Sequence, residues 1–74
     1  MKIKYLRFEK NEAILFPVHQ EHKEIFRHFT DKNIQSAGTI KIKNGKIIDI
    51  CGSYSLKLEP DPDDENLLAI LMQL

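Results

Sequence analysis

The residues best suited to chemistry are the histidines of residues 18–30. His22 lies at the centre of a predicted apolar helix stripe, where a histidine can bind a metal or carry a proton. His19, three residues earlier, could face the same metal, but zinc needs three or four protein ligands and only Cys51 and a distant acid could complete the set. His28 lies on another side of the helix. We predict no metal or other cofactor, and interpret His22 as a half-buried histidine bonded to the backbone.

A nucleophile activated by a histidine would have to be Cys51 or one of three serines, Ser36, Ser53 and Ser55. The serines alternate on a predicted strand face, where hydroxyl side chains commonly meet solvent or form cross-strand hydrogen bonds. Since no motif pairs any of them with a base, the sequence favours a protein that is not an enzyme.

Four acids follow one another closely near the C-terminus: Asp61, Asp63, Asp64 and Glu65. They resemble a calcium loop, but Pro62 and the missing turn glycine break the EF-hand pattern. An Asp before a proline, followed by acids, is typical of a helix start. We therefore predict a helix from Asp61 to the end of the chain.

Five lysines are expected to share a sheet surface: Lys2, Lys4, Lys41, Lys43 and Lys46. RNA-binding sheets combine such charges with exposed aromatic side chains. Of the two tyrosines, Tyr5 and Tyr54, the second is predicted on the core side of its strand. Lysines that protect a sheet edge from aggregation explain the cluster more simply. Nucleic-acid binding by the basic N-terminal half remains the alternative.

Charge is segregated along the chain, although its formal sum is zero. Residues 1–46 hold ten Lys or Arg against five Asp or Glu, and residues 47–74 hold one against six, so the two parts carry +5 and −5. Such a division is expected either of a nucleic-acid face or of two surfaces that pack one subunit on another.

The clearest structural signal is a β-hairpin over residues 38–50, with an Asn44-Gly45 turn between two apolar runs. A two-residue loop would oppose Lys43 and Lys46 and separate the isoleucines onto different faces. A three-residue loop pairs Ile42 with Lys46 and Ile40 with Ile48, which gathers the isoleucines. We predict this second register, with Gly45 at positive φ, because burying an isoleucine stabilises by about 1.5–3 kcal/mol and a cross-strand charge pair by only about 0.2–1.

The remaining patterns predict strands over residues 2–9 and 13–17, a helix over 18–30, and a last strand that continues to residue 58. In the last strand, Ile48, Ile50, Gly52, Tyr54, Leu56 and Leu58 share the core face. The predicted fold is a single α+β domain over residues 1–74, a two-layer sandwich of order ββαββα. It has a four-stranded antiparallel sheet with both helices on one face.

A chain of 74 residues buries only about 60–65% of its unfolded surface, so its stability is marginal without reinforcement. One cysteine excludes an internal disulfide, which leaves self-association. In the C-terminal helix Leu67, Ile70, Leu71 and Leu74 are predicted to face inward, with Leu68 and Met72 outward. We predict a homodimer through Leu68 and Met72, or through the small-residue sheet face of Ala37, Thr39, Cys51, Ser53 and Ser55.

No apolar signal-peptide core follows Met1, and the longest apolar run, residues 67–72, is far shorter than the roughly 20 residues of a membrane span. A lone cysteine fits a reducing compartment. The expected protein is cytoplasmic, has no membrane partner, and acts as a self-associating interaction module that binds an unidentified protein.

Ser36-Ala37-Gly38, the run Gly52-Ser53-Tyr54-Ser55-Leu56 and the acidic helix start resemble a group of short uncharacterised bacterial proteins. Members of that group carry Ser-Ala-Gly, then Gly-x-Ser-x-Ser-Leu on a strand, then an acidic helix start. This chain departs from the pattern at Glu59-Pro60-Asp61-Pro62, where a basic residue is common. The resemblance covers about half the chain and implies the fold, but no biochemical function.

Overall fold

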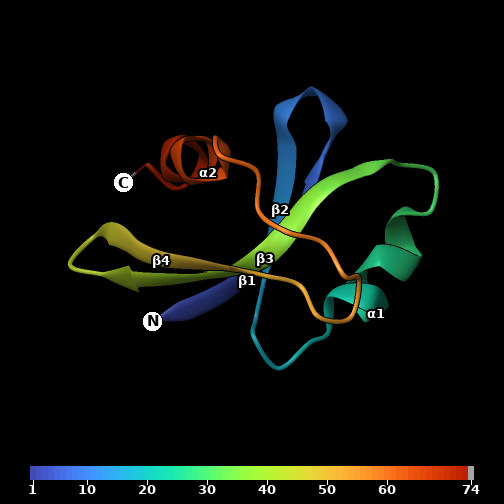
Figure 1. The fold of residues 1–74 in the computed structure, drawn as a ribbon, viewed down its shortest axis with the longest axis horizontal. Helices are drawn as coiled ribbons and strands as arrows, with labels where there is room; N and C mark the ends of the chain where they lie inside the picture. The colour runs from blue at the N-terminus through green and yellow to red at the C-terminus, as the bar shows by residue number, and fades with distance from the viewer. Residues whose placement is uncertain (74) are drawn as a thin grey trace.

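The computed structural model describes residues 1–73, apart from the side chain of Lys10, and shows a four-stranded antiparallel sheet with two helices (Figure 1). The predicted α+β class and the four-stranded sheet are confirmed. The elements are β1 (Lys2–Phe8), the 3-10 turn η1 (Glu9–Asn11), β2 (Glu12–Phe16), α1 (His22–Phe26), the 3-10 turn η2 (Arg27–Phe29), β3 (Ile34–Lys43), β4 (Lys46–Gly52) and α2 (Asp64–Met72).

The strands lie in the order β2-β1-β3-β4, so β1 and β3 are central. The first hairpin matches the predicted strands within a residue or two. The first helix is shorter than predicted, because residues 17–20 form a turn in which the amide of Gln20 donates to the carbonyl of Pro17 at 3.2 Å. None of the helices in residues 1–73 has the length and apolar character needed to cross a bilayer.

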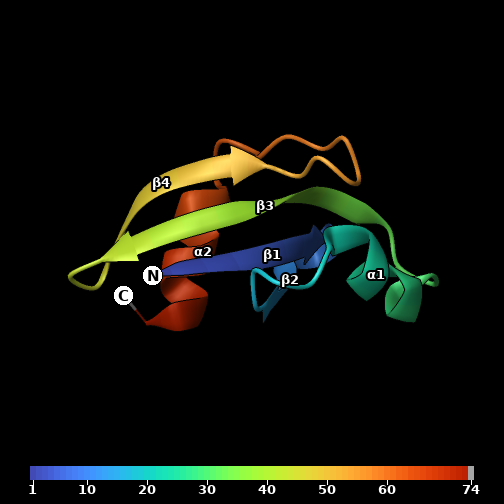
Figure 2. The same ribbon diagram turned by 90° about the horizontal axis from the view of Figure 1, so that it is seen from below.

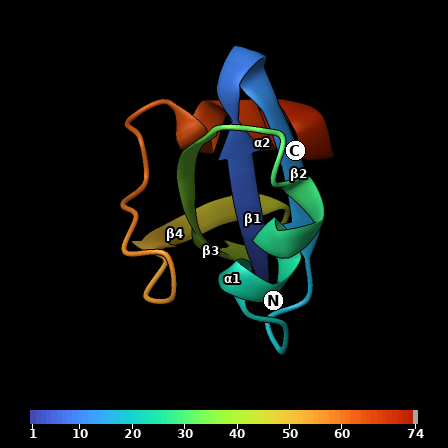
Figure 3. The same cartoon turned by 90° about the vertical axis from the view of Figure 1, so that its right-hand side faces the viewer.

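The sheet lies between the two helices, which corrects the prediction that both cover one face. Side chains alternate along β1: Tyr5 packs with Leu68 of α2, while the neighbouring Leu6 belongs to a second cluster with Phe26 of α1. In Figure 3, β1 passes behind α1 and in front of α2. The double coverage explains why the first hairpin has apolar residues on both faces.

The β3–β4 hairpin has a different register from the predicted one. Asn44 and Gly45 both have positive φ, 53° and 74°, and form a two-residue turn that places Lys43 opposite Lys46. The positive φ of Gly45 is confirmed, and the three-residue loop is wrong. A bulge restores the core: Ile42 lies opposite Ile47, and Ile40 opposite Ile50.

Ile48 is the extra residue of this bulge and is 51% exposed, while the half-buried Ile47 and Ile50 pack against Ile40 and Ile42 without an odd-length loop. The prediction considered a bulge only at Gly45 in the turn, and the bulge at Ile48 changes which side chains of β4 face the core.

Strand β4 ends at Gly52, so the predicted continuation to residue 58 is also wrong. The amide of Ser53 donates to the carbonyl of Leu58 at 2.8 Å and closes a turn, within which Lys57 has a φ of 56°. Tyr54, predicted on the core face, is 98% exposed at this turn. Figure 2 shows the orange segment continuing past the end of β4 before it turns back toward α2.

Helix α2 begins at Asp64, three residues after the predicted start, and presents the opposite face to the sheet. Leu68 is 1% exposed and Met72 packs against the same core, whereas Ile70 is 73% exposed and Leu71 48%. The predicted interface through Leu68 and Met72 is therefore wrong. Leu74, the last residue of the predicted inner stripe, lies outside the described residues.

Candidate functional site

A buried ionic cluster joins β1 to the start of α2. Arg7 is 3% exposed and Asp64 is fully buried, and the guanidinium Nη1 of Arg7 donates to Oδ1 of Asp64 at 2.7 Å. Nη1 also donates to Oδ1 of Asp63, and Nη2 to the side-chain oxygen of Asn11, both at 2.7 Å. Two adjacent carboxylates thus bind one guanidinium.

Asp64 receives three further hydrogen bonds. The hydroxyl of Tyr5 donates to Oδ2 at 2.5 Å, that of Ser36 to Oδ1 at 3.0 Å, and the backbone amide of Asp61 to Oδ2 at 2.9 Å. Burial by itself would raise the pKa of Asp64, but the bonds from Tyr5, Arg7 and Ser36 outweigh it and hold that pKa below its usual value. Burial and the adjacent Asp64 carboxylate raise the pKa of Tyr5 far above its usual value.

This cluster holds α2 against the sheet, because Tyr5, Arg7 and Ser36 of the sheet all donate to Asp64 at the start of the helix. A buried charged pair needs such additional hydrogen bonds to offset the cost of removing it from water. Carboxylate oxygens of Asp61, Asp63 and Asp64 lie within 4.8 Å of one another, but all three carboxylates already form ion pairs with Arg7. We predicted these acids as a helix start and did not predict their ion pairs with Arg7. The spacing Asp61-x-x-Asp64 was the available signal, since an acid three residues after a cap accepts the amide of the capping residue.

His22 is buried, as a structural histidine should be, and does not share a site with the exposed His19. Its Nε2 lies 2.7 Å from the carbonyl oxygen of Gly38, to which it donates, and its ring contacts Phe16 edge-on. Burial lowers the pKa of His22, and the nearby Lys4 ammonium lowers it further, while the bond to Gly38 raises it. The net direction favours the neutral ring.

We therefore expect the free energy of unfolding to fall as the pH is lowered below the unfolded histidine pKa of about 6.5. The pKa of His22 is lower in the folded protein than in the unfolded chain, so the unfolded chain takes up the proton at a higher pH. Acid therefore favours the unfolded state until the pH has fallen through the folded pKa. Urea unfolding measured at several pH values should show this slope in the wild type and in His28→Gln, whose histidine is exposed. His22→Gln should lose the slope; a slope that survives this change would contradict the prediction.

The residues predicted as nucleophiles or as a small-residue interface do not form one exposed surface, although Thr39 lies opposite Cys51 in the sheet. Ala37 is fully buried beneath α1 and Ser53 is 5% exposed, so neither is available for a subunit contact. Ser36 is committed to Asp64. Thr39 is half-buried, and Cys51 and Ser55 are exposed.

The predicted basic surface, by contrast, is brought together. Strand register places Lys2 opposite Lys41, and Lys43 follows two residues later on the same face of β3. Lys46 lies opposite Lys43 at the turn. We call Lys2, Lys41 and Lys43 the lysine face. Lys4 lies on the same side but is half-buried and donates to the carbonyl of Gln20 at 2.8 Å, which ties it to the turn before α1.

A shallow cavity of about 240 Å³ opens on the lysine face. Lys2, Lys41 and the exposed ring of Tyr54 line it, together with Thr39, Asp49 and Cys51. Asp49 lies opposite Lys41 in the register and is the acid that borders this cavity. The arrangement offers ammonium groups and an aromatic surface side by side.

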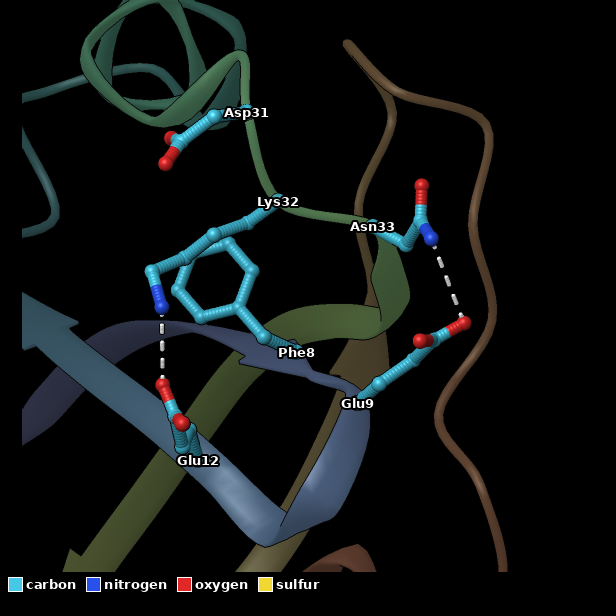
Figure 4. A pocket seen from close by; sticks show the side chains of 6 residues that line it. All are labelled: Phe8, Glu9, Glu12, Asp31, Lys32 and Asn33. Atoms are coloured by element: carbon cyan, nitrogen blue, oxygen red, sulfur yellow. Dashed lines mark hydrogen bonds and ion pairs between the residues drawn. The ribbon is translucent and has the colours of Figure 1, made fainter.

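A second cavity, of about 210 Å³, lies where η1 and β2 meet the loop before β3 (Figure 4). Its carboxylates come from Glu9, Glu12 and Asp31. Lys32 supplies the cation: its Nζ lies 2.9 Å from Oε2 of Glu12 and 5.7 Å from the ring centre of Phe8. Hydrogen bonding to Glu12 raises the pKa of Lys32. The ammonium group in this cavity is therefore already paired with a carboxylate.

The residues that carry the resemblance to short bacterial proteins have packing roles. A Cβ on Gly38 would lie 2.1 Å from the carbonyl oxygen of Cys51, and one on Gly52 would lie 2.7 Å from that of Leu58. Ser36 supports Asp64. No protein-family model matches the chain, and no curated protein or solved structure is significantly similar to it.

Proposed function

We propose that the protein is a non-enzymatic binding module that holds a single-stranded nucleic acid on the lysine face. The observation that carries this proposal is the position of Tyr54, which is 98% exposed and lines the same cavity as Lys2 and Lys41. Ammonium groups that follow the phosphates, beside an aromatic ring on which a base stacks, form the usual combination in single-strand binding proteins.

The charge on this side of the sheet supports the same conclusion. Lys41 and Lys43 are exposed on β3, and the N-terminal ammonium of Met1 lies 3.0 Å from the carbonyl oxygen of Ile42 between them. Among the described residues, the strand register places Asp49 and Glu12 on this side of the sheet, and Glu12 is paired with Lys32. A polyanion would gain from these cations by releasing its condensed counterions.

Tyr54 favours a single strand over a duplex, because a base inside a duplex is already stacked on both sides. The ring lies in the turn that follows β4, and the carbonyl of Tyr54 accepts the amide of Lys57 at 3.3 Å, which fixes the turn. The fixed turn presents the ring without a loss of backbone freedom on binding.

We expect Lys41→Glu with Lys43→Glu to weaken binding of a single-stranded oligonucleotide of about 12 bases at least 10-fold at low salt. Tyr54→Ala should weaken binding about 5- to 100-fold, since a stacked base contributes roughly 1–3 kcal/mol. Fluorescence anisotropy with labelled RNA and DNA measures both effects. The double lysine variant should also show a shallower dependence of affinity on salt, whereas Tyr54→Ala should keep the wild-type slope.

The matched control is Lys23→Glu with Arg27→Glu, which changes the net charge equally but alters exposed residues on α1 and η2. This control should bind nearly as the wild type does. An equal loss in both charge variants would show nonspecific attraction, and tighter binding to a duplex than to a single strand would remove the role of Tyr54. Either result overturns the proposal.

A further inference from the structure

We propose that the groove between α2 and the β3–β4 turn is the contact surface for a second copy of this chain. The groove has a volume of about 450 Å³ and is lined by Gly45, Lys46, Ile47, Glu65, Asn66 and Ala69. It lies on the α2 side of the sheet and differs from the surface through Leu68 and Met72 that the sequence predicts.

The centre of the groove is apolar and its helical wall continues into an exposed side chain. Ile47 is half-buried at the floor, and Ala69 is half-buried on the helix. Ile70 lies four residues after Asn66, so it occupies the same side of α2, where it is 73% exposed. An isoleucine this exposed beside an apolar groove is a suitable anchor for the equivalent groove of a partner.

The charges at the rim make the surface complementary to itself. Lys46, at the turn end of the edge strand β4, and Glu65 on α2 both line the groove and are exposed, and neither forms an ion pair with another side chain that the structure describes. In a two-fold dimer, each contact from one residue of the first copy to another residue of the second copy is repeated with the two copies exchanged. Lys46 of each copy can therefore meet Glu65 of the other, around an apolar centre formed by Ile47, Ala69 and Ile70.

Self-complementarity favours a second copy over the other occupants of this groove. An acid at the helix wall disfavours a polyanion, and a basic or acidic peptide would find only one of the two rim charges matched. Pairing through α2 leaves Lys2 and Lys41 uncovered, because they lie on the other face of the sheet. The inference is thus independent of nucleic-acid binding.

Sedimentation velocity at rising protein concentration, without nucleic acid, tests the proposal. The wild type should approach twice the monomer mass of 8.6 kDa at high micromolar concentration. Ile70→Asp should keep the protein monomeric with an unchanged far-UV circular dichroism spectrum, since the side chain is exposed. The matched control is Val18→Asp, which alters an exposed apolar residue in the turn before α1 and should leave the dimer intact.

A charge swap gives a second and independent readout. Lys46→Glu and Glu65→Lys should each weaken dimerisation at least about 5-fold, and the double variant should recover most of the wild-type affinity. A wild type that remains monomeric at high micromolar concentration overturns the proposal. A dimer that survives both Ile70→Asp and the single reversals places the contact elsewhere and equally overturns it.

Discussion

Asp64→Ala should lower the free energy of unfolding by about 3–5 kcal/mol, the usual cost of removing one member of a buried ion pair. Asp64 is fully buried, and its carboxylate accepts hydrogen bonds from Arg7, Tyr5 and Ser36. Removing it takes one carboxylate from a guanidinium that is 3% exposed and whose Nε already lacks a partner, although Asp63 and Asn11 still bind Arg7. It also leaves the hydroxyls of Tyr5 and Ser36 without their acceptor.

The loss would be a large part of the total stability, because domains have about 0.05–0.15 kcal/mol per residue, or roughly 4–11 kcal/mol for this chain. Far-UV circular dichroism during urea unfolding measures it. Asp63→Ala is the matched control: Asp63 also binds Arg7, but its side chain is 64% exposed, so the loss should be distinctly smaller. Equal losses in the two variants would show that the buried network adds nothing beyond a surface ion pair.

Gly38→Ala should destabilise the protein by about 3 kcal/mol, at the upper end of the usual cost of overpacking a core. Gly38 lies in the central strand β3, where an added Cβ would come within 2.1 Å of the carbonyl oxygen of Cys51 on β4. The obstructing atom belongs to the backbone and cannot rotate away. Part of β4 would have to separate from β3, which would also disturb the cavity on the lysine face.

Gly45→Ala is the control for Gly38→Ala. An added Cβ at Gly45 would meet no atom within 4 Å, but the φ of 74° strains any residue with a side chain by about 1–2 kcal/mol. Urea unfolding of both variants should therefore show the larger loss at Gly38. The reverse order would mean that β3 and β4 separate more easily than their packing indicates.

The two variants also separate what could be predicted from the sequence and what could not. The turn at Asn44-Gly45 can be predicted from these two residues alone, because few residues adopt a positive φ without strain. The need for glycine at position 38 depends on the distance to Cys51 across the sheet, which no pattern in the sequence contains.

The candidate site divides in the same way. Lysines two residues apart share a strand face in any register, so the grouping of Lys41 with Lys43 was predictable, and Lys2 joined them through the pairing of β1 with β3. The exposure of Tyr54 was not predictable, because it depends on the residue at which β4 ends. That end comes from the two backbone hydrogen bonds between Ser53 and Leu58, which close a turn without glycine.

By itself the sequence determined the strands of the first hairpin, the Asn44-Gly45 turn and the presence of a C-terminal helix, since each follows from periodicity and turn chemistry over a few residues. Only the tertiary structure decided the orientation of α2. Residues 67–72 are all apolar, so periodicity cannot choose an inner face, and the buried bond between Arg7 and Asp64, which are 57 residues apart, turns Leu68 inward instead. The bulge in β4 and the placement of the helices on opposite faces are likewise products of long-range packing, which adds its free energy only when distant segments meet.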